Sequence, residues 1–243
     1  MTFRLPPESE ALMLKGDPWL TAGRRLSYSH SGEDILLGIL FGAIDCGFYV
    51  DFGCFDPVIN SNTHALHRKG WRGLNLDANP AAIAKFKEVR PADINCNLAI
   101  AEVDAEVDLY VFGPEAPSNS TSSSFAEGIS AGQNVPIAQT LKIPGLPTSE
   151  VISRFLPPGT VVDFWNVDLE SLDLTALTTN DWKAFRPRVI AIEDFEFTFD
   201  GQPSPIHEVL RAEGYAAFSR YQYTSFYVDR AATRGLQQLP RIT

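Results

Sequence analysis

The stretch Tyr49-Val-Asp-Phe-Gly-Cys54 decides the fold that we predict for this chain of 243 residues. It begins as a short apolar strand and ends at Gly53, where the backbone can turn sharply and approach a ligand closely. A second strand, Gly73-Leu-Asn-Leu-Asp77, follows a segment that Ser61 can cap and Gly70 can end as a helix. Strands that alternate with helices at this spacing predict a mostly parallel sheet.

The same alternation extends to both sides of these two strands. Before them, Ser31 is expected to cap a helix, with Asp34 completing a capping box. After them, Asn79 and Ser204 each precede a proline that suits the first turn of a helix. The remaining elements are expected as a strand near 93–100, a helix over 148–155, strands over 161–168 and 188–193, and paired antiparallel strands near 215–219 and 225–229. The pattern predicts an α/β fold with helices on both faces of one sheet.

The chain divides into one main domain and shorter flanking parts. Residues 1–27 are rich in proline and polar groups and are expected to form an arm or cap, and residues 231–243 a tail. The domain covers residues 28–230. Within it, residues 113–147 contain the run Ser120-Thr-Ser-Ser-Ser124 and several Gly and Pro, so we expect an irregular insertion or lid there.

The composition excludes several classes of function. The net charge of −10 and the scattered Lys and Arg argue against binding to nucleic acid and favour a small or neutral substrate. The three cysteines form no CxxC pair, which suits buried thiols in a reducing cytoplasm. We find neither the apolar core of a signal peptide nor a membrane-spanning run, so we expect a cytoplasmic protein without a membrane partner.

Acidic or small residues stand where the predicted strands end. In an open α/β sheet, ligands bind beyond the carboxyl ends of the strands. These ends carry Asp51 and Gly53, Asp77, Asp168 and Glu170, and Glu193 and Asp194. Asp77 stands where a carboxylate can accept hydrogen bonds from both hydroxyls of a ribose.

The loop after the first strand has one glycine, whereas a dinucleotide site has the pattern G-x-G-x-x-G for its pyrophosphate. This loop suits a ligand with an adenosine and a zwitterionic tail. The tail's amino group needs an acid, and its carboxylate needs donors. Ser61, Asn62 and Thr63, at a predicted helix start, supply such donors.

An ordered series of short motifs resembles the FkbM family of S-adenosylmethionine-dependent methyltransferases. The resemblance covers about residues 27 to 230 and rests on Tyr28-Ser-His-Ser-Gly-Glu-Asp34, Tyr49-Val-Asp-Phe-Gly-Cys54, Ser61-Asn-Thr63, Lys69-Gly-Trp71, Leu76-Asp-Ala-Asn-Pro80, Asn97-Leu-Ala99, Val167-Asp-Leu-Glu170, and Arg186-Pro187 with Ile192-Glu193. It implies a Rossmann-like class I methyltransferase fold with seven strands, the last antiparallel. It also implies O-methylation of a sugar or natural-product hydroxyl.

The resemblance also assigns roles to individual residues. Asp51 and Gly53 would border the methionine part of S-adenosylmethionine, and Ser61, Asn62 and Thr63 its carboxylate. Asp77 would hold the ribose with Ala78 and Asn79 beside it, and Asn97 would lie near the adenine. Asp168 and Glu170 would face the reacting end.

Two positions depart from the family pattern. His30 stands where the family usually has Gln, and Ser171 stands where it usually has Gly. These departures concern the acceptor side more than the cofactor side. They leave open a catalytically degenerate module that binds or scaffolds without turnover.

The strand-end carboxylates allow more than one chemistry. They can bind a divalent ion, act as a general base towards a hydroxyl, or lie on a solvated rim. We expect no metal, and we take Asp168 as the first candidate for orienting or deprotonating the acceptor, with His30 and Glu193 behind it. The acceptor is expected to be a small molecule or a glycan, while the sequence leaves the oligomeric state open. A nicotinamide-dependent oxidoreductase is a further alternative, against which the single-glycine loop argues.

Overall fold

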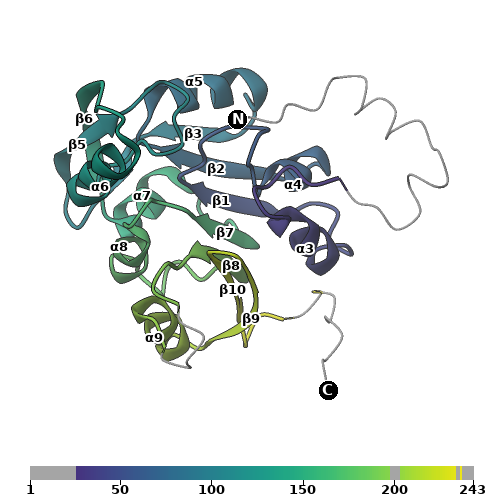
Figure 1. Cartoon of the computed structure of the whole chain (residues 1–243). Coiled ribbons are helices and arrows are strands. Elements are labelled where there is room, and N and C mark those ends of the chain that lie inside the picture. Colours follow the sequence, from purple (N-terminus) through teal and green to yellow (C-terminus); the bar gives the residue numbers. More distant parts are fainter. Residues whose placement is uncertain (1–25, 198–202, 234–235, 237–243) are drawn as a thin grey trace.

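The computed structural model describes residues 26–197, 203–233 and 236. Nearly all of the expected arm and most of the expected tail lie outside these residues. The described chain builds a seven-stranded sheet of order β3-β2-β1-β7-β8-β10-β9, in which β10 runs antiparallel to both of its neighbours (Figure 1). Its strands are β1 Phe48–Phe52, β2 Arg72–Asp77, β3 Ile94–Asn97, β7 Phe164–Val167, β8 Val189–Glu193, β9 Tyr215–Tyr221 and β10 Thr224–Asp229. The predicted Rossmann-like class I fold is confirmed.

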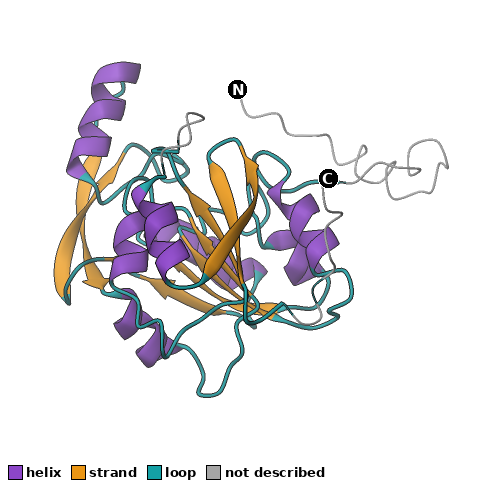
Figure 2. Cartoon of the chain, turned by 90° about the horizontal axis from the view of Figure 1, so that it is seen from below, coloured by secondary structure: helices purple, strands orange, loops and turns teal. Residues whose placement is uncertain are grey.

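Helices cover both faces of this sheet (Figure 2). Trp71 and Phe164 are fully buried on one face, where they pack with the apolar residues of α3 and α4. Trp165 is fully buried in the cluster on the other face, with residues of α7, α8 and α9. The helices are α3 Glu33–Leu40, α4 His64–Arg68, α5 Pro80–Val89, α7 Thr148–Phe155, α8 Asp173–Thr178 and α9 Pro205–Ala212. Within the described residues, no helix has the length and apolar character needed to cross a bilayer.

The segment 113–147 is more regular than its composition suggests. It contains helix α6, Ser123–Gln133, and strand β6, Gln139–Leu146, so the prediction of an irregular insertion is wrong. Strand β6 pairs antiparallel with β5, Ala105–Val111, and parallel with β4, Ala99–Ile100, in a second sheet (Figure 1). The serine run begins a helix, because Ser122 Oγ accepts a hydrogen bond from Phe125 N. The strand expected at 93–100 is two strands, because β3 belongs to the main sheet and β4 to the second sheet.

Local capping follows the sequence in two helices and departs from it in two others. Ser61 was expected to cap the helix that is α4, but Thr63 is its N-cap, although Ser61 Oγ accepts a hydrogen bond from His64 N at 3.1 Å. Asn79 accepts a hydrogen bond from Ala81 N, and Ser204 accepts one from His207 N, as predicted. The capping box of Ser31 and Asp34 is wrong, because Gly32 occupies the N-cap position of α3 in a left-handed conformation. Asp34 instead accepts hydrogen bonds from the loop before the helix, from Ser27 Oγ, Tyr28 N and Ser29 Oγ. Two cysteines are buried as expected, but Cys46 is exposed.

A buried arginine joins the end of α5 to the loop that follows β1. The Arg90 side chain is fully buried, and its guanidinium lies 4.9 Å from the centre of the Phe86 ring. Nη1 donates to Thr63 Oγ1 at 2.9 Å and to Tyr49 OH at 3.2 Å. Nη2 donates to Ser61 Oγ at 3.0 Å and to Pro57 O. One side chain therefore fixes the loop that carries the predicted cofactor donors.

We predict that Arg90→Met destabilises the fold by roughly 3–5 kcal/mol, because it leaves four buried acceptors without their donor. Urea unfolding at neutral pH measures the change. Lys87→Met removes a cation from an exposed position on the same helix and should change the unfolding free energy by less than about 0.5 kcal/mol. Equal effects of the two substitutions would contradict a central role for Arg90.

Candidate active site

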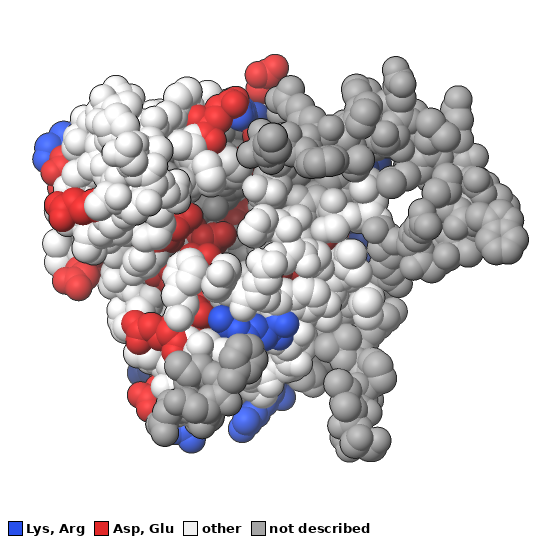
Figure 3. Space-filling view, in the orientation of Figure 1, with Lys and Arg blue, Asp and Glu red and all other residues white. Residues whose placement is uncertain are grey.

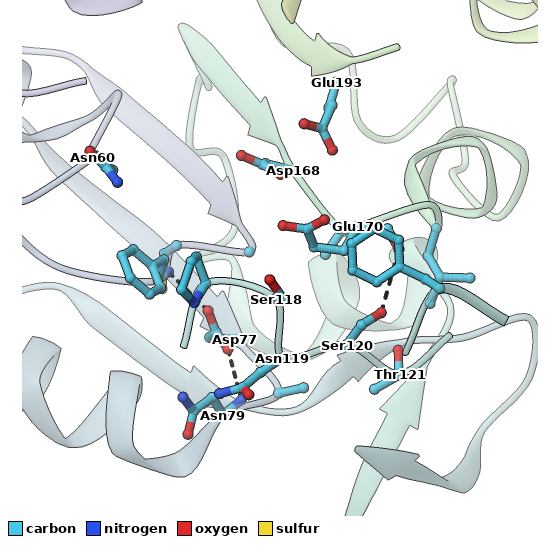
Figure 4. Close-up of a pocket in the computed structure, with 18 of the residues that line it drawn as sticks. Asn60, Asp77, Asn79, Ser118, Asn119, Ser120, Thr121, Asp168, Glu170 and Glu193 are labelled. Atoms are coloured by element: carbon cyan, nitrogen blue, oxygen red, sulfur yellow. Dashed lines mark hydrogen bonds between the residues drawn. The ribbon is translucent and has the colours of Figure 1, made fainter. Parts of the chain in front are cut away.

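A cavity of about 700 Å³ lies at the carboxyl ends of β1, β2, β7 and β8 (Figure 4). Its volume is in the range that holds drug-sized ligands and cofactors. The loops after β1 and β2 contribute one part of the wall, the ends of β7 and β8 contribute another, and residues 116–121 of the insertion contribute a third. The cavity therefore lies where an open α/β sheet is expected to bind its ligand.

Gly53 allows β1 and β7 to approach each other at the floor of this cavity. It has a φ of 74°, and a Cβ added there would lie 1.7 Å from Asp168 O. Gly53 N donates to Leu76 O at 2.9 Å, which ties the turn to β2. Only glycine fits this position, so the backbone itself requires Gly53, apart from any contact with a ligand.

Asp51 lies beneath the cavity at the centre of a buried network. Its carboxylate accepts hydrogen bonds from Thr63 Oγ1 at 2.6 Å and from Asn166 Nδ2 at 3.0 Å. Burial raises the pKa of Asp51, while these two donors oppose the rise. Asn62 Nδ2 donates to Asn166 Oδ1 at 2.8 Å, so the same network holds Asn62 in place.

The three predicted donors after β1 separate into two groups. Ser61 and Asn62 line the cavity. Thr63 is fully buried outside the lining, and its hydroxyl donates to Asp51. Thr63 therefore supports the loop, and its hydroxyl proton is not directed at a ligand.

Asp77, at the end of β2, lines the cavity with both carboxylate oxygens fixed by backbone groups. It accepts from Phe55 N at 2.9 Å and from Asn79 N at 2.7 Å. Burial raises the pKa of Asp77 to about 6, against the effect of these two donors. Each oxygen keeps a further lone pair, so the carboxylate can still accept from a bound hydroxyl.

Asn97 holds the backbone of this loop rather than forming the cavity wall. Its Nδ2 donates to Asp77 O at 3.0 Å and to Ala78 O at 2.9 Å. Ala78 lines the cavity, whereas Asn97 does not. The apolar wall beside Asp77 is formed by Leu76, Ile100 and Leu109.

Three acidic side chains, Asp168, Glu170 and Glu193, gather on the opposite side of the cavity from Asp77 and Asn79 (Figure 4). The carboxyl groups of Asp168 and Glu193 lie beside each other, at the ends of β7 and β8 (Figure 4). Burial raises the pKa of Glu193 strongly, and the neighbouring charge of Asp168 raises it further. Asp168 is open to the cavity, and its enclosure by the cavity walls, together with the charge of Asp51, raises its pKa. Of these two carboxyl groups, Glu193 has the pKa that is raised further.

Glu170 and Asp173 complete this acidic group. Burial and the charge of Asp168 raise the pKa of Glu170 to about 7. Asp173 was not predicted as a site residue; it is buried in the first turn of α8 and accepts from Leu169 N at 3.0 Å. Among the described residues, no group of three or more His, Cys, Asp or Glu side chains is arranged to hold a metal ion.

His30 also belongs to the cavity lining, at an exposed position. The loop that carries it is attached to the donor loop after β1, because Ser61 N donates to Tyr28 O at 3.0 Å. The structure therefore brings nine of the eleven predicted site residues together around one cavity. Those nine are His30, Asp51, Gly53, Ser61, Asn62, Asp77, Ala78, Asp168 and Glu193.

Several lining residues were not predicted, because their strands or turns could not be placed from sequence. Ser118, Asn119, Ser120 and Thr121 come from the insertion, and Phe195 and Tyr223 come from the segments after β8 and before β10. The expectation that residues 113–147 form a lid gave the only indication of the first group.

Comparison with protein families decides the assignment. A model of the methyltransferase FkbM domain matches residues 45–217, which is more than half of the chain. This chain belongs to the FkbM methyltransferase family. The FkbM domain implies a methyltransferase that uses S-adenosylmethionine. The comparisons with curated proteins and with solved structures gave no match.

The backbone explains one departure of this FkbM methyltransferase from the family pattern. Ser171, at the usual glycine position, has a φ of 84°, and Glu170 before it has a φ of 51°. Both lie in the left-handed region, where an L-residue is strained and glycine is not. The chain keeps the turn that glycine favours while carrying a serine in it.

We predict that Ser171→Gly stabilises the protein by roughly 0.5–1 kcal/mol. Relief of left-handed strain, about 1–2 kcal/mol, exceeds the entropy cost of glycine, about 0.5–1 kcal/mol. Calorimetry should show a rise in Tm of roughly 1–4 °C. Ser130→Gly, inside α6, is the matched control and should lower Tm, because glycine weakens a helix interior. A lower Tm for both variants would refute the strain at Ser171.

We predict that Glu170→Gln stabilises the protein near pH 7 and has little effect near pH 4. In the folded wild type the Glu170 pKa is raised from 4.5 to about 7, so ionisation costs stability as the pH rises through this range. The expected gain at pH 7.5 is roughly 1–3 kcal/mol. Urea unfolding of both proteins from pH 4 to pH 8 measures it. A constant difference across this range would contradict the raised pKa.

Proposed function

We propose that this protein transfers the methyl group of S-adenosylmethionine to a hydroxyl oxygen of a small-molecule or glycan acceptor. The observation that carries the proposal is the division of one cavity into two parts. Asp77 and the loop after β1 form a part suited to a nucleoside with an amino-acid tail. Asp168, Glu170 and Glu193 form a part suited to an acceptor hydroxyl.

The first part fits S-adenosylmethionine by its chemistry. Asp77 has free lone pairs for the ribose hydroxyls, and Leu76, Ile100 and Leu109 offer an apolar wall for the adenine. Ser61 and Asn62 line the side where the carboxylate of the tail would lie. When bound, S-adenosylmethionine supplies a methyl group already activated by its sulfonium.

The second part supplies proton removal and alignment. Asp168 is our candidate catalytic residue, because it lies at the end of β7 and is the more acidic member of the pair with Glu193. We assign Glu193 a positioning role, because its protonated carboxyl group can donate a hydrogen bond to the neighbouring carboxylate of Asp168 and so orient it. As the C–O bond forms and the S–C bond breaks, the hydroxyl proton passes to Asp168.

The alternative of a catalytically degenerate module rested on His30 and Ser171. His30 lines the cavity, and Ser171 keeps the left-handed turn at its position. Neither departure removes a group on which the proposed chemistry depends. The proposal for turnover is therefore favoured over a binding role alone.

We predict that S-adenosylhomocysteine binds the wild type and binds Asp77→Asn at least tenfold more weakly. The substitution replaces a charged acceptor for ribose hydroxyls, and hydrogen bonds to charged groups contribute about 1.5–3 kcal/mol. Isothermal calorimetry measures both affinities. Asp104→Asn, at an exposed position outside the cavity, should bind like the wild type. No binding to the wild type at millimolar ligand would refute the cofactor assignment.

We predict that Asp168→Asn lowers methyl transfer about 10²–10⁴-fold, the range expected for loss of a general base. Tritiated S-adenosylmethionine and a panel of hydroxylated glycans and natural products provide the assay. Glu193→Gln should lose less, because the amide can still donate a hydrogen bond to Asp168. S-adenosylhomocysteine affinity should be unchanged in both variants. Cofactor binding without transfer to any panel member would instead favour the degenerate module.

A further inference from the structure

Two large aromatic side chains stand exposed at the acceptor part of the cavity. Phe195 and Tyr223 are each 53% exposed, and both line the cavity. Their ring centroids lie 5.1 Å apart at an interplanar angle of 45°. Large apolar surface left open beside polar groups is typical of a ligand-binding site.

A backbone hydrogen bond ties together the two segments that carry these rings. Asp194 N donates to Tyr223 O at 2.8 Å, which ties the turn between β9 and β10 to the end of β8. Gln222, in the same turn, has a φ of 46°. The aromatic pair is therefore anchored to the strand that also carries Glu193.

The charge of the cavity has one sign. Of its described lining residues, none is Lys or Arg, whereas Asp168, Glu170 and Glu193 are all among them. Glu193 stands two residues before Phe195 and pairs with Thr224, the residue after Tyr223. In Figure 3, acidic side chains gather in the hollow near the centre of the molecule. Arg220 is engaged elsewhere, since it stacks on Phe197 and donates to Asp194 O at 2.8 Å. A phosphorylated or carboxylated acceptor would meet repulsion here.

We propose that the acceptor is a hydroxylated amine, such as an amino sugar, an inference that rests on the proposed methyl transfer. The ammonium group lies against Phe195 and Tyr223 and forms an ion pair with Glu170. Aromatic faces attract cations, and a carboxylate strengthens the attraction through a charge-assisted hydrogen bond. The same orientation presents a neighbouring hydroxyl to Asp168.

This arrangement also explains why oxygen would be methylated in a molecule that contains nitrogen. An ammonium has no lone pair with which to attack the methyl group, so pairing with Glu170 protects the nitrogen. The hydroxyl loses its proton to Asp168 and forms the new C–O bond, while the ammonium keeps all of its protons. Glu170 thus keeps the amine protonated, while Asp168 removes the proton of the hydroxyl, so only the oxygen can attack the methyl group.

Titration of the protein with three monosaccharides, followed by NMR chemical shifts at pH 7, tests this proposal. Glucosamine, glucose and glucuronate share a pyranose ring and differ in charge. Glucosamine should bind at least tenfold more tightly than glucose, and glucuronate more weakly than glucose. Glu170→Gln and Tyr223→Ala should each reduce the preference for glucosamine at least fivefold. Glu127→Gln, at an exposed position of α6 outside the lining, should leave it unchanged.

Equal binding of glucosamine and glucose, or binding of none of the three, would overturn the proposal, as would an undiminished preference in both cavity variants. The titrations are made with and without S-adenosylhomocysteine. A preference for glucosamine in a protein that does not bind S-adenosylhomocysteine would support the cation site while refuting methyl transfer. Binding of S-adenosylhomocysteine without any preference would refute only the cation site.

Discussion

The guanidinium of Arg90 is the constraint on which the cofactor part of the site depends. It is fully buried, so its donors need acceptors within the protein, and the acceptors of Nη1 and Nη2 come from β1 and the loop that follows it. Its charge also offsets the buried carboxylate of Asp51. The loop between Gly53 and Thr63 therefore has one arrangement, and Ser61 and Asn62 reach the cavity because of it.

The acidic side of the cavity lowers the stability of the fold. Four carboxyl groups, at Asp168, Glu170, Asp173 and Glu193, lie near one another with raised pKa values, so their environment disfavours ionisation. Natural proteins retain such groups mainly at functional sites. The left-handed backbone at Glu170 and Ser171 adds strain at the same place. Strain and charge thus coincide where the acceptor is proposed to bind.

The central sheet could be predicted because its signals are local. Each signal lies within a few residues of the element that it predicts. Gly53 follows the apolar strand β1, Asp77 ends β2, and Asn79 with Pro80 begins α5. The second sheet could not, because β4 and β6 pair across more than forty residues and a serine-rich composition conceals α6. Thr63 and Asn97 were assigned to the cofactor, but the direction of a side chain depends on tertiary contacts. Arg90 belongs to none of the motifs found in the sequence, so its role could not be predicted.

The second sheet has a small apolar cluster of its own, formed around Ala99, Leu109, Val111 and Ile143. Two residues of this sheet, Ile100 and Leu109, form the wall proposed for the adenine. In the loop before α6, Ser120 Oγ donates a hydrogen bond to Glu170 O, on the acidic side of the cavity. The small sheet and its loop therefore border both parts of the cavity, so a change in their packing would alter donor and acceptor binding together.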